Sequence, residues 1–132
     1  MLIRIDKNAE DPLYLQIRDQ IIVAIAREEI TPGSALPSVR SLATDLGINL
    51  HTVNKAYAVL RDEGYVVMRG RAGATIADPA ENLASYRSEA ASRQMTDTLH
   101  NLALAHRARG GQAEEFLAFA KSAAASAFRE DD

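Results

Sequence analysis

The chain has 132 residues, of which 47% are hydrophobic and 25% charged, and its formal net charge is −3. This length suits a small domain with an appendage and leaves no room for a large catalytic domain. The absence of cysteine excludes disulfides and cysteine-ligated metal sites.

The residues that usually carry chemistry are sparse and scattered. The three histidines, His51, His100 and His106, form neither an HxH nor an HExxH pattern, so we expect no metal ion. No nucleophile-and-base set, phosphate-binding loop or dinucleotide motif is present, and we expect neither a cofactor nor an enzyme. No apolar run approaches the ~20 residues of a membrane span, and the first residues lack the apolar core of a secretory signal. We expect a cytoplasmic protein with no membrane partner.

The first predicted elements are a short extended segment, residues 2–5, and an amphipathic helix. Asp11 is the expected cap of this helix and Pro12 its first residue, and its end is expected near Ile30. Its apolar side chains recur at helical spacing on one stripe: Tyr14, Ile17, Ile21, Ala24 and Ile25.

Two short helices follow, joined by a tight turn. Ser38 caps the first, residues 39–46, and Gly47 ends it. Asn49 caps the second, residues 50–63, which carries Val53, Ala56, Tyr57 and Leu60 on one face. This arrangement is typical of a helix-turn-helix.

A β-hairpin comes next. The β-prone runs 65–68 and 74–77 flank a glycine-containing loop, and residues 64–77 contain two arginines and no acid. Two helices followed by a hairpin predict a winged helix with a basic tip. Asp78-Pro79 marks a boundary, which divides the chain into a winged helix-turn-helix domain, residues 1–78, and a tail, residues 79–132.

The tail is predicted as a helical hairpin. Its helices cover residues 81–109, with a polar interruption at Ser92–Gln94, and residues 112–128, and Gly110-Gly111 separates them. Two such helices bury too little apolar surface alone, so we expect them to pack on a second subunit, although an intramolecular core would give the same periodicity. The fold class is α+β and mainly helical. The candidate dimerisation residues are Leu99, Leu102, Phe116 and Phe119.

Several spaced motifs resemble one known family. They are Pro12-Leu13-Tyr14, Pro32-Gly33, Leu36-Pro37-Ser38-Val39-Arg40-Ser41-Leu42-Ala43, Leu46-Gly47-Ile48-Asn49, Thr52-Val53, Ala56-Tyr57, Gly64-Tyr65, Gly70 and Gly73. In this order, over residues 12–78, they resemble the N-terminal domain of GntR-family transcription regulators. The short tail resembles the YtrA subfamily, which implies a homodimer formed through the tail and repression of ABC-transporter operons. An aminotransferase-like domain does not fit in the remaining residues, so no pyridoxal phosphate is expected.

The resemblance and the helix-turn-helix geometry together indicate residues that contact DNA. Asn54 is the best candidate for reading a base, with a solvated helix residue as the alternative. Ser38 and Thr52 lie near helix N-termini that suit a phosphate, where they also serve as caps. Tyr57 has two interpretations, a hydroxyl contact with the DNA backbone or packing in the core. The full set is Ser38, Arg40, Asn49, Leu50, His51, Thr52, Asn54, Lys55, Arg69, Gly70 and Arg71.

Two positions depart from relatives. Val39 stands where many carry glutamate, and Leu50 stands where fatty-acid-responsive members carry a base-contacting arginine, so their operator cannot be assumed.

The sequence predicts a transcription regulator that binds a palindromic operator in double-stranded DNA as a homodimer, with repression implied by the resemblance. The alternative is a winged helix that binds protein without reading DNA, which the acidic net charge favours. A small-molecule effector is left open, because a pocket of ~300 Å³ fits only at the dimer seam or between tail and wing.

Overall fold

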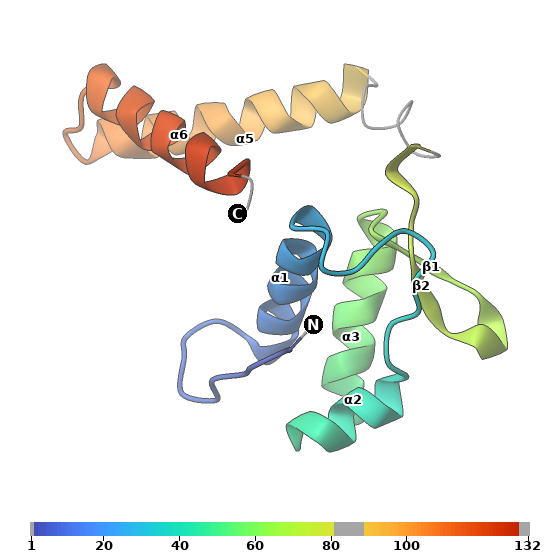
Figure 1. Ribbon diagram of the computed structural model, residues 1–132. Coiled ribbons are helices and arrows are strands. Elements are labelled where there is room, and N and C mark those ends of the chain that lie inside the picture. The colour runs from blue at the N-terminus through green and yellow to red at the C-terminus, as the bar shows by residue number, and fades with distance from the viewer. Residues whose placement is uncertain (1, 81–88, 130–132) are drawn as a thin grey trace. The chain divides into compact units, whose positions relative to one another are not determined.

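The computed structural model describes residues 2–80 and 89–129 (Figure 1). Contacts within the chain divide it into two compact units, residues 1–82 and residues 83–132. The division predicted at residue 78, with its assignment of roles to the two parts, stays a prediction. Within the part of the chain that the structure describes, no helix has the length and apolar character needed to cross a bilayer.

Helix α1, Leu13–Ala26, opens the first unit and buries Ile17 and Ile21 completely. The predicted cap by Asp11 is wrong, because Pro12 occupies the N-cap position and no side chain bonds there. The preceding loop is held instead by Gln16, whose amide nitrogen donates to the carbonyl oxygens of Asp6 (3.0 Å) and Asp11 (2.9 Å).

Helix α1 also ends earlier than predicted, at Ala26 rather than near Ile30. Glu28 adopts a left-handed backbone, with φ of 59°, and the amide of Glu29 donates to the carbonyl of Ala24 at 2.9 Å. This is the hydrogen bond of a Schellman motif, which closes a helix and normally places glycine at the left-handed position. Without that glycine the sequence carried no stop signal.

The next two helices confirm the predicted helix-turn-helix. Helix α2, Val39–Leu46, is capped by the Ser38 hydroxyl, which accepts a hydrogen bond from the amide of Ser41 at 3.0 Å. Gly47 ends it with φ of 66°, a conformation that glycine adopts without strain. Helix α3, Leu50–Asp62, is capped by Asn49, whose side-chain oxygen accepts from the amide of His51 at 2.8 Å.

A small antiparallel hairpin completes the winged helix. Strand β1, Val66–Met68, pairs with β2, Ala74–Ile76, and a 3₁₀ turn at Gly70–Ala72 closes the tip. A third segment, not predicted from the sequence, joins the hairpin: the amide of Leu36 donates to the carbonyl of Ala74 at 2.9 Å, next to a bridge between Ala35 and Thr75. The loop before α2 is therefore anchored to the wing.

One apolar cluster holds these elements together. Five of its side chains have no exposed surface: Ile17 and Ile21 from α1, and Val53, Ala56 and Leu60 from α3. Burying a valine, leucine or isoleucine side chain contributes about 1.5–3 kcal/mol relative to exposure. The cluster therefore fixes α3 by its inner face.

The second unit is a helical hairpin of α5, Glu89–Ala108, and α6, Ala113–Ala127 (Figure 1). The predicted interruption at Ser92–Gln94 is wrong, because α5 runs through it with these polar residues facing solvent. The predicted first part of the helix, residues 81–88, lies outside the described residues. Helix α6 begins with a capping box between Gln112 and Glu115.

Candidate nucleic-acid interface

Helix α3 presents a rigid polar surface at its N-terminal half. Leu50 is 44% exposed, and His51, Asn54 and Lys55 are exposed beside it. The opposite side of the helix is buried in the core, so these side chains are held on one outward face. An α-helix fits the major groove of B-DNA, where the edges of the base pairs are distinguishable.

Two predicted residues on this helix are engaged in its own structure. Asn49 uses its side-chain oxygen for the cap and retains its amide nitrogen as a donor. Thr52 is half-buried, and its amide donates to the carbonyl of Asn49 at 3.1 Å. The structure thus confirms Asn49 as the cap of α3, whereas the capping role predicted for Thr52 is wrong, because Thr52 lies inside the helix. A phosphate contact by either residue stays a prediction.

Helix α2 brings a second pair of predicted residues to the surface. Ser38 is exposed and its hydroxyl caps the helix. Arg40 is exposed in the first turn. A cation there suits the phosphate backbone, because charge-assisted hydrogen bonds to phosphate are short and strong.

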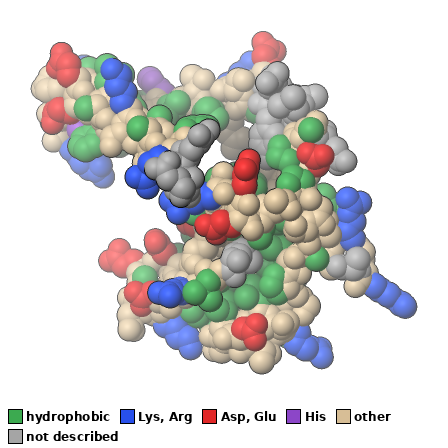
Figure 2. Space-filling model, viewed as in Figure 1, with side chains coloured by type: hydrophobic (Ala, Val, Ile, Leu, Met, Phe, Trp, Pro, Cys, Tyr) green, Lys and Arg blue, Asp and Glu red, His purple; other side chains and the backbone are tan. Residues whose placement is uncertain are grey.

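The wing carries three predicted residues at its tip. Arg69, Gly70 and Arg71 are all exposed, and Gly70 has a left-handed backbone with φ of 60°. The amide of Arg69 donates to the carbonyl of Gly73 at 2.7 Å, which closes the loop. Figure 2 shows Lys and Arg side chains projecting on the side where Figure 1 places this hairpin. The tip therefore combines positive charge with a compact backbone.

Tyr57 belongs to the core. It is 2% exposed, and its hydroxyl donates to the carbonyl of Pro37 at 2.7 Å. Burial raises the pKa of this hydroxyl to about 12. Of the two interpretations of Tyr57, packing is the one the structure supports, and the hydroxyl holds the loop that leads into α2.

Tyr14 lies beside α3, and sequence reasoning did not identify it as a neighbour of the predicted DNA-binding residues. The Nζ atom of Lys55 lies 4.1 Å from the ring centroid of Tyr14, a cation–π contact between α3 and α1. The two residues line a shallow pocket of about 380 Å³ with Leu13, His51 and Thr52. The sequence placed Tyr14 on the buried stripe of α1, and only the packing of α1 on α3 brings it to Lys55.

An ion pair fixes the far end of α3. The Arg18 guanidinium donates to both carboxylate oxygens of Glu63, at 2.7 and 2.6 Å, and to Asp19. The hydrogen bond to Glu63, together with that to Asp19, raises the pKa of the Arg18 guanidinium above its ordinary value, so Arg18 stays charged. The bidentate geometry links α1 to the C-terminus of α3.

The predicted dimerisation residues divide into two groups. Leu99, Leu102 and Phe119 are 49%, 57% and 66% exposed. Phe116 is half-buried, with its ring centroid 6.1 Å from that of His106. Helix α6 has no buried residue, so the hairpin exposes much of its apolar surface.

Among the described residues no group of three or more His, Asp or Glu side chains forms a candidate metal site.

The chain is similar in sequence to known regulatory proteins. The model of the family described as "Bacterial regulatory proteins, gntR family" matches residues 13–76. The chain is 41% identical over 74 residues to the uncharacterized HTH-type transcriptional regulator YhcF of Bacillus subtilis, 56% of this chain and 61% of that one. It is 42% identical over 71 residues to the HTH-type transcriptional repressor YtrA of the same species, 53% of this chain and 55% of that one. The matches thus span little more than half of these relatives.

Solved structures extend the likeness into the tail. YtrA from Sulfolobus acidocaldarius, titled a GntR-family transcription factor, is 41% identical with a TM-score of 0.61, over 80% of this chain and 99% of that one. A protein titled transcriptional antiterminator from Listeria monocytogenes has a TM-score of 0.84 over 100% of this chain and 96% of that one. Its sequence is only 23% identical, so this second likeness concerns the fold alone.

Proposed function

The chain belongs to the GntR family of regulatory proteins and to its YtrA-like branch, and on this premise we propose that it is a transcription repressor that binds a palindromic operator as a homodimer. The observation that carries the proposal is the outward polar face of α3, with His51, Asn54 and Lys55 exposed on a helix whose other face is locked in the core. Such a rigid helix can enter a major groove without losing conformational freedom.

Base reading and backbone contact have different candidates in this proposal. The Asn54 amide can form two hydrogen bonds with an adenine edge, worth about 1–3 kcal/mol of discrimination against other bases. Arg40, Arg69 and Arg71 contact phosphates or a minor groove, and their contribution depends little on sequence. Lys55, held over the Tyr14 ring, is a further phosphate contact.

Dimerisation through the tail is the second part of the proposal. The exposed apolar side chains of α5 and α6, Leu99, Leu102 and Phe119 among them, support a seam with a second copy. A two-fold dimer places two α3 helices on half-sites related by the same symmetry. We further propose a transporter operon among the targets, from the same subfamily resemblance; a small-molecule effector stays a prediction.

The test is a binding-site selection from random duplex DNA at about physiological salt, where specific affinity exceeds non-specific affinity. We expect enrichment of one two-fold symmetric sequence. Affinity for that sequence should fall as salt rises, with a log–log slope of roughly −0.9 per neutralised phosphate. No enrichment, together with a salt-insensitive complex with a protein, would support the interaction module instead.

Matched variants separate the two kinds of contact. Asn54→Ala should relax the preference at one base position, whereas Asn101→Ala, the same change on exposed α5, should leave the selected sequence unchanged. Arg69→Ala should weaken binding evenly across sequences and reduce the salt slope by about 1, with Arg93→Ala as its control. Unchanged binding in both Asn54→Ala and Arg69→Ala would contradict the assigned interface.

A further inference from the structure

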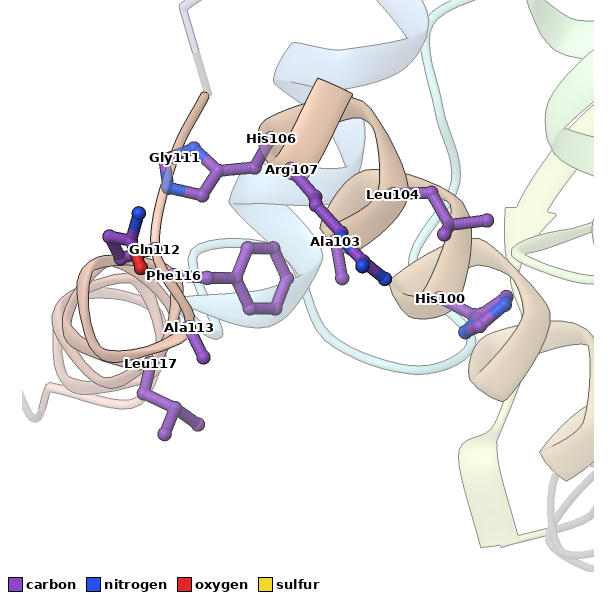
Figure 3. Close-up of a pocket in the computed structure, with 10 residues that line it drawn as sticks. All are labelled: His100, Ala103, Leu104, His106, Arg107, Gly111, Gln112, Ala113, Phe116 and Leu117. Carbon is purple, nitrogen blue, oxygen red and sulfur yellow. The ribbon is translucent and has the colours of Figure 1, made fainter. Parts of the chain in front are cut away.

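The helical hairpin contains a groove that operator binding does not use. It lies between the C-terminal half of α5 and the start of α6, and its volume is about 560 Å³ (Figure 3). Pockets that hold small organic ligands commonly measure about 300–1,000 Å³. In Figure 3 the Phe116 ring projects from α6 toward α5, and Leu104 and His100 follow one another along α5. The groove therefore has the size of a small-molecule site.

The chemistry of the groove combines an apolar floor with one cationic side chain at its edge. Leu104, Phe116 and Leu117 line it together with two alanines. Arg107 and His100 also line it, and no aspartate or glutamate does. Among the described residues the Arg107 guanidinium forms no ion pair, so its charge is available to a ligand. The site thus suits a ligand with an apolar body and an anionic head.

Two of the four predicted dimerisation residues, Leu99 and Leu102, lie on a different face of α5 from Leu104 and Arg107, whereas a third, Phe116, lines the groove itself. At 100° per residue, Leu99 and Leu102 are centred about 140° around the helix from His100, Leu104 and Arg107. Neither Leu99 nor Leu102 lines the groove. A dimer formed through Leu99 and Leu102 leaves Leu104 and Arg107 accessible, whereas a dimer that also buries Phe116 covers the groove; the Ala103→Phe variant described below distinguishes the two.

Charge also argues against a second copy of the chain as the occupant of the groove. A two-fold contact centred on this face would bring two Arg107 guanidinium groups near one another, with no acidic lining residue to pair with them. Like charges placed together destabilise a contact. An organic anion in the groove would instead be attracted to the Arg107 guanidinium.

We propose that this groove binds a small organic carboxylate, whose apolar body packs on Leu104, Phe116 and Leu117 and whose carboxylate pairs with Arg107. The planar guanidinium matches a carboxylate with two parallel hydrogen bonds. The other nearby imidazole, that of His106, is excluded from this role, because its Nε2 atom is buried and faces Glu115 at 4.0 Å. The inference concerns the tail alone and holds or fails independently of operator binding.

The test compares two probes on the purified full chain by calorimetry: phenylbutyrate, and its neutral analogue phenylbutanol. The carboxylate should bind roughly tenfold more tightly than the alcohol, as expected for one charge-assisted pair. Arg107→Met should reduce carboxylate binding to the level of the alcohol and leave the alcohol unchanged. Arg109→Met, an exposed arginine that does not line the groove, should change neither.

A second variant tests the location. Ala103→Phe should fill the groove and abolish binding of both probes, while sedimentation shows the same oligomeric state as the parent chain. The proposal is overturned if phenylbutyrate shows no saturable binding at millimolar concentration, if both probes bind equally, or if Arg107→Met has no effect. It is also overturned if Ala103→Phe dissociates a dimer, because a second copy would then occupy the groove.

Discussion

The two units of the chain differ in where their apolar side chains lie. In the winged-helix unit, Ile17, Ile21, Val53 and Leu60 are fully enclosed by three helices and a hairpin. In the tail, α6 has no buried residue, and Phe119 and Phe128 are 66% and 86% exposed. Similar helical periodicity in the sequence therefore ends in a closed core in one region and an open apolar surface in the other. The first unit buries its core within a single chain, whereas the tail leaves much of its apolar surface for another molecule to cover.

The largest expected effect is in the closed core. Leu60→Ala should lower the free energy of unfolding by about 3 kcal/mol, because it removes buried methyl groups and leaves a cavity. Leu102→Ala, on the open surface, should cost less than about 0.5 kcal/mol in the monomer, and more only where the proposed dimer forms. Urea denaturation at two protein concentrations measures both. If Leu60→Ala and Leu102→Ala lowered the free energy of unfolding equally at both protein concentrations, the proposed difference between the two units would be contradicted.

The tail nevertheless has one tightly packed point, the turn between its helices. A Cβ at Gly111 would overlap the His106 imidazole, which packs edge-on against Phe119 with centroids 5.9 Å apart. Gly111→Ala should therefore destabilise the hairpin by about 2 kcal/mol through overpacking. Hydrogen exchange of the α6 amides measures this, and the double variant with His106→Ala should recover part of the loss. Undiminished protection in Gly111→Ala would mean that the turn is as loosely packed as the rest of the tail.

The core of the first unit should also respond to alkaline pH. The pKa of Tyr57 is raised by burial from 10.0 to about 12, so above pH 10 the unfolded chain releases this proton before the folded chain does. Stability should therefore fall as pH rises from about 10 to 12. Tyr57→Phe should lose about 1 kcal/mol at neutral pH, because the Pro37 carbonyl loses its donor, and should flatten the alkaline decline. Denaturation curves of the parent chain and of Tyr57→Phe across this pH range provide the comparison. Parallel declines in stability would contradict the role assigned to Tyr57.

The smallest expected effect is a gain. Glu28 ends α1 in a left-handed conformation that costs an ordinary residue about 1 kcal/mol. Glu28→Gly should recover up to about that amount in the thermal unfolding of the first unit. The tail should be unaffected, as hydrogen exchange of its amides would verify. A loss of stability would mean that the Glu28 side chain contributes more than its backbone costs.

Local signals in the sequence determined much of the first unit. Ser38 and Asn49 are capping residues, Gly47 permits the left-handed turn, and Val53, Ala56 and Leu60 repeat at helical spacing, so the helix-turn-helix and its inner face followed from the residues alone. The outward position of Asn54 and Lys55 followed because the apolar residues of the same helix occupy its inner face. Prediction failed at the end of α1, where no glycine marks the stop at Glu28, and at its start, where the capping signal of Asp11 was misleading because Pro12 takes the N-cap position.

Other features depended on contacts between distant residues, which no local pattern encodes. The hydroxyl of Tyr57 bonds to Pro37 twenty positions away, Arg18 pairs with Glu63, and Tyr14 meets Lys55. Each of these depends on how α1, α2 and α3 pack, because side-chain partners are chosen by the geometry of the closed core. The sequence thus determined the elements and their apolar faces, and the tertiary structure decided which polar groups those faces bring together.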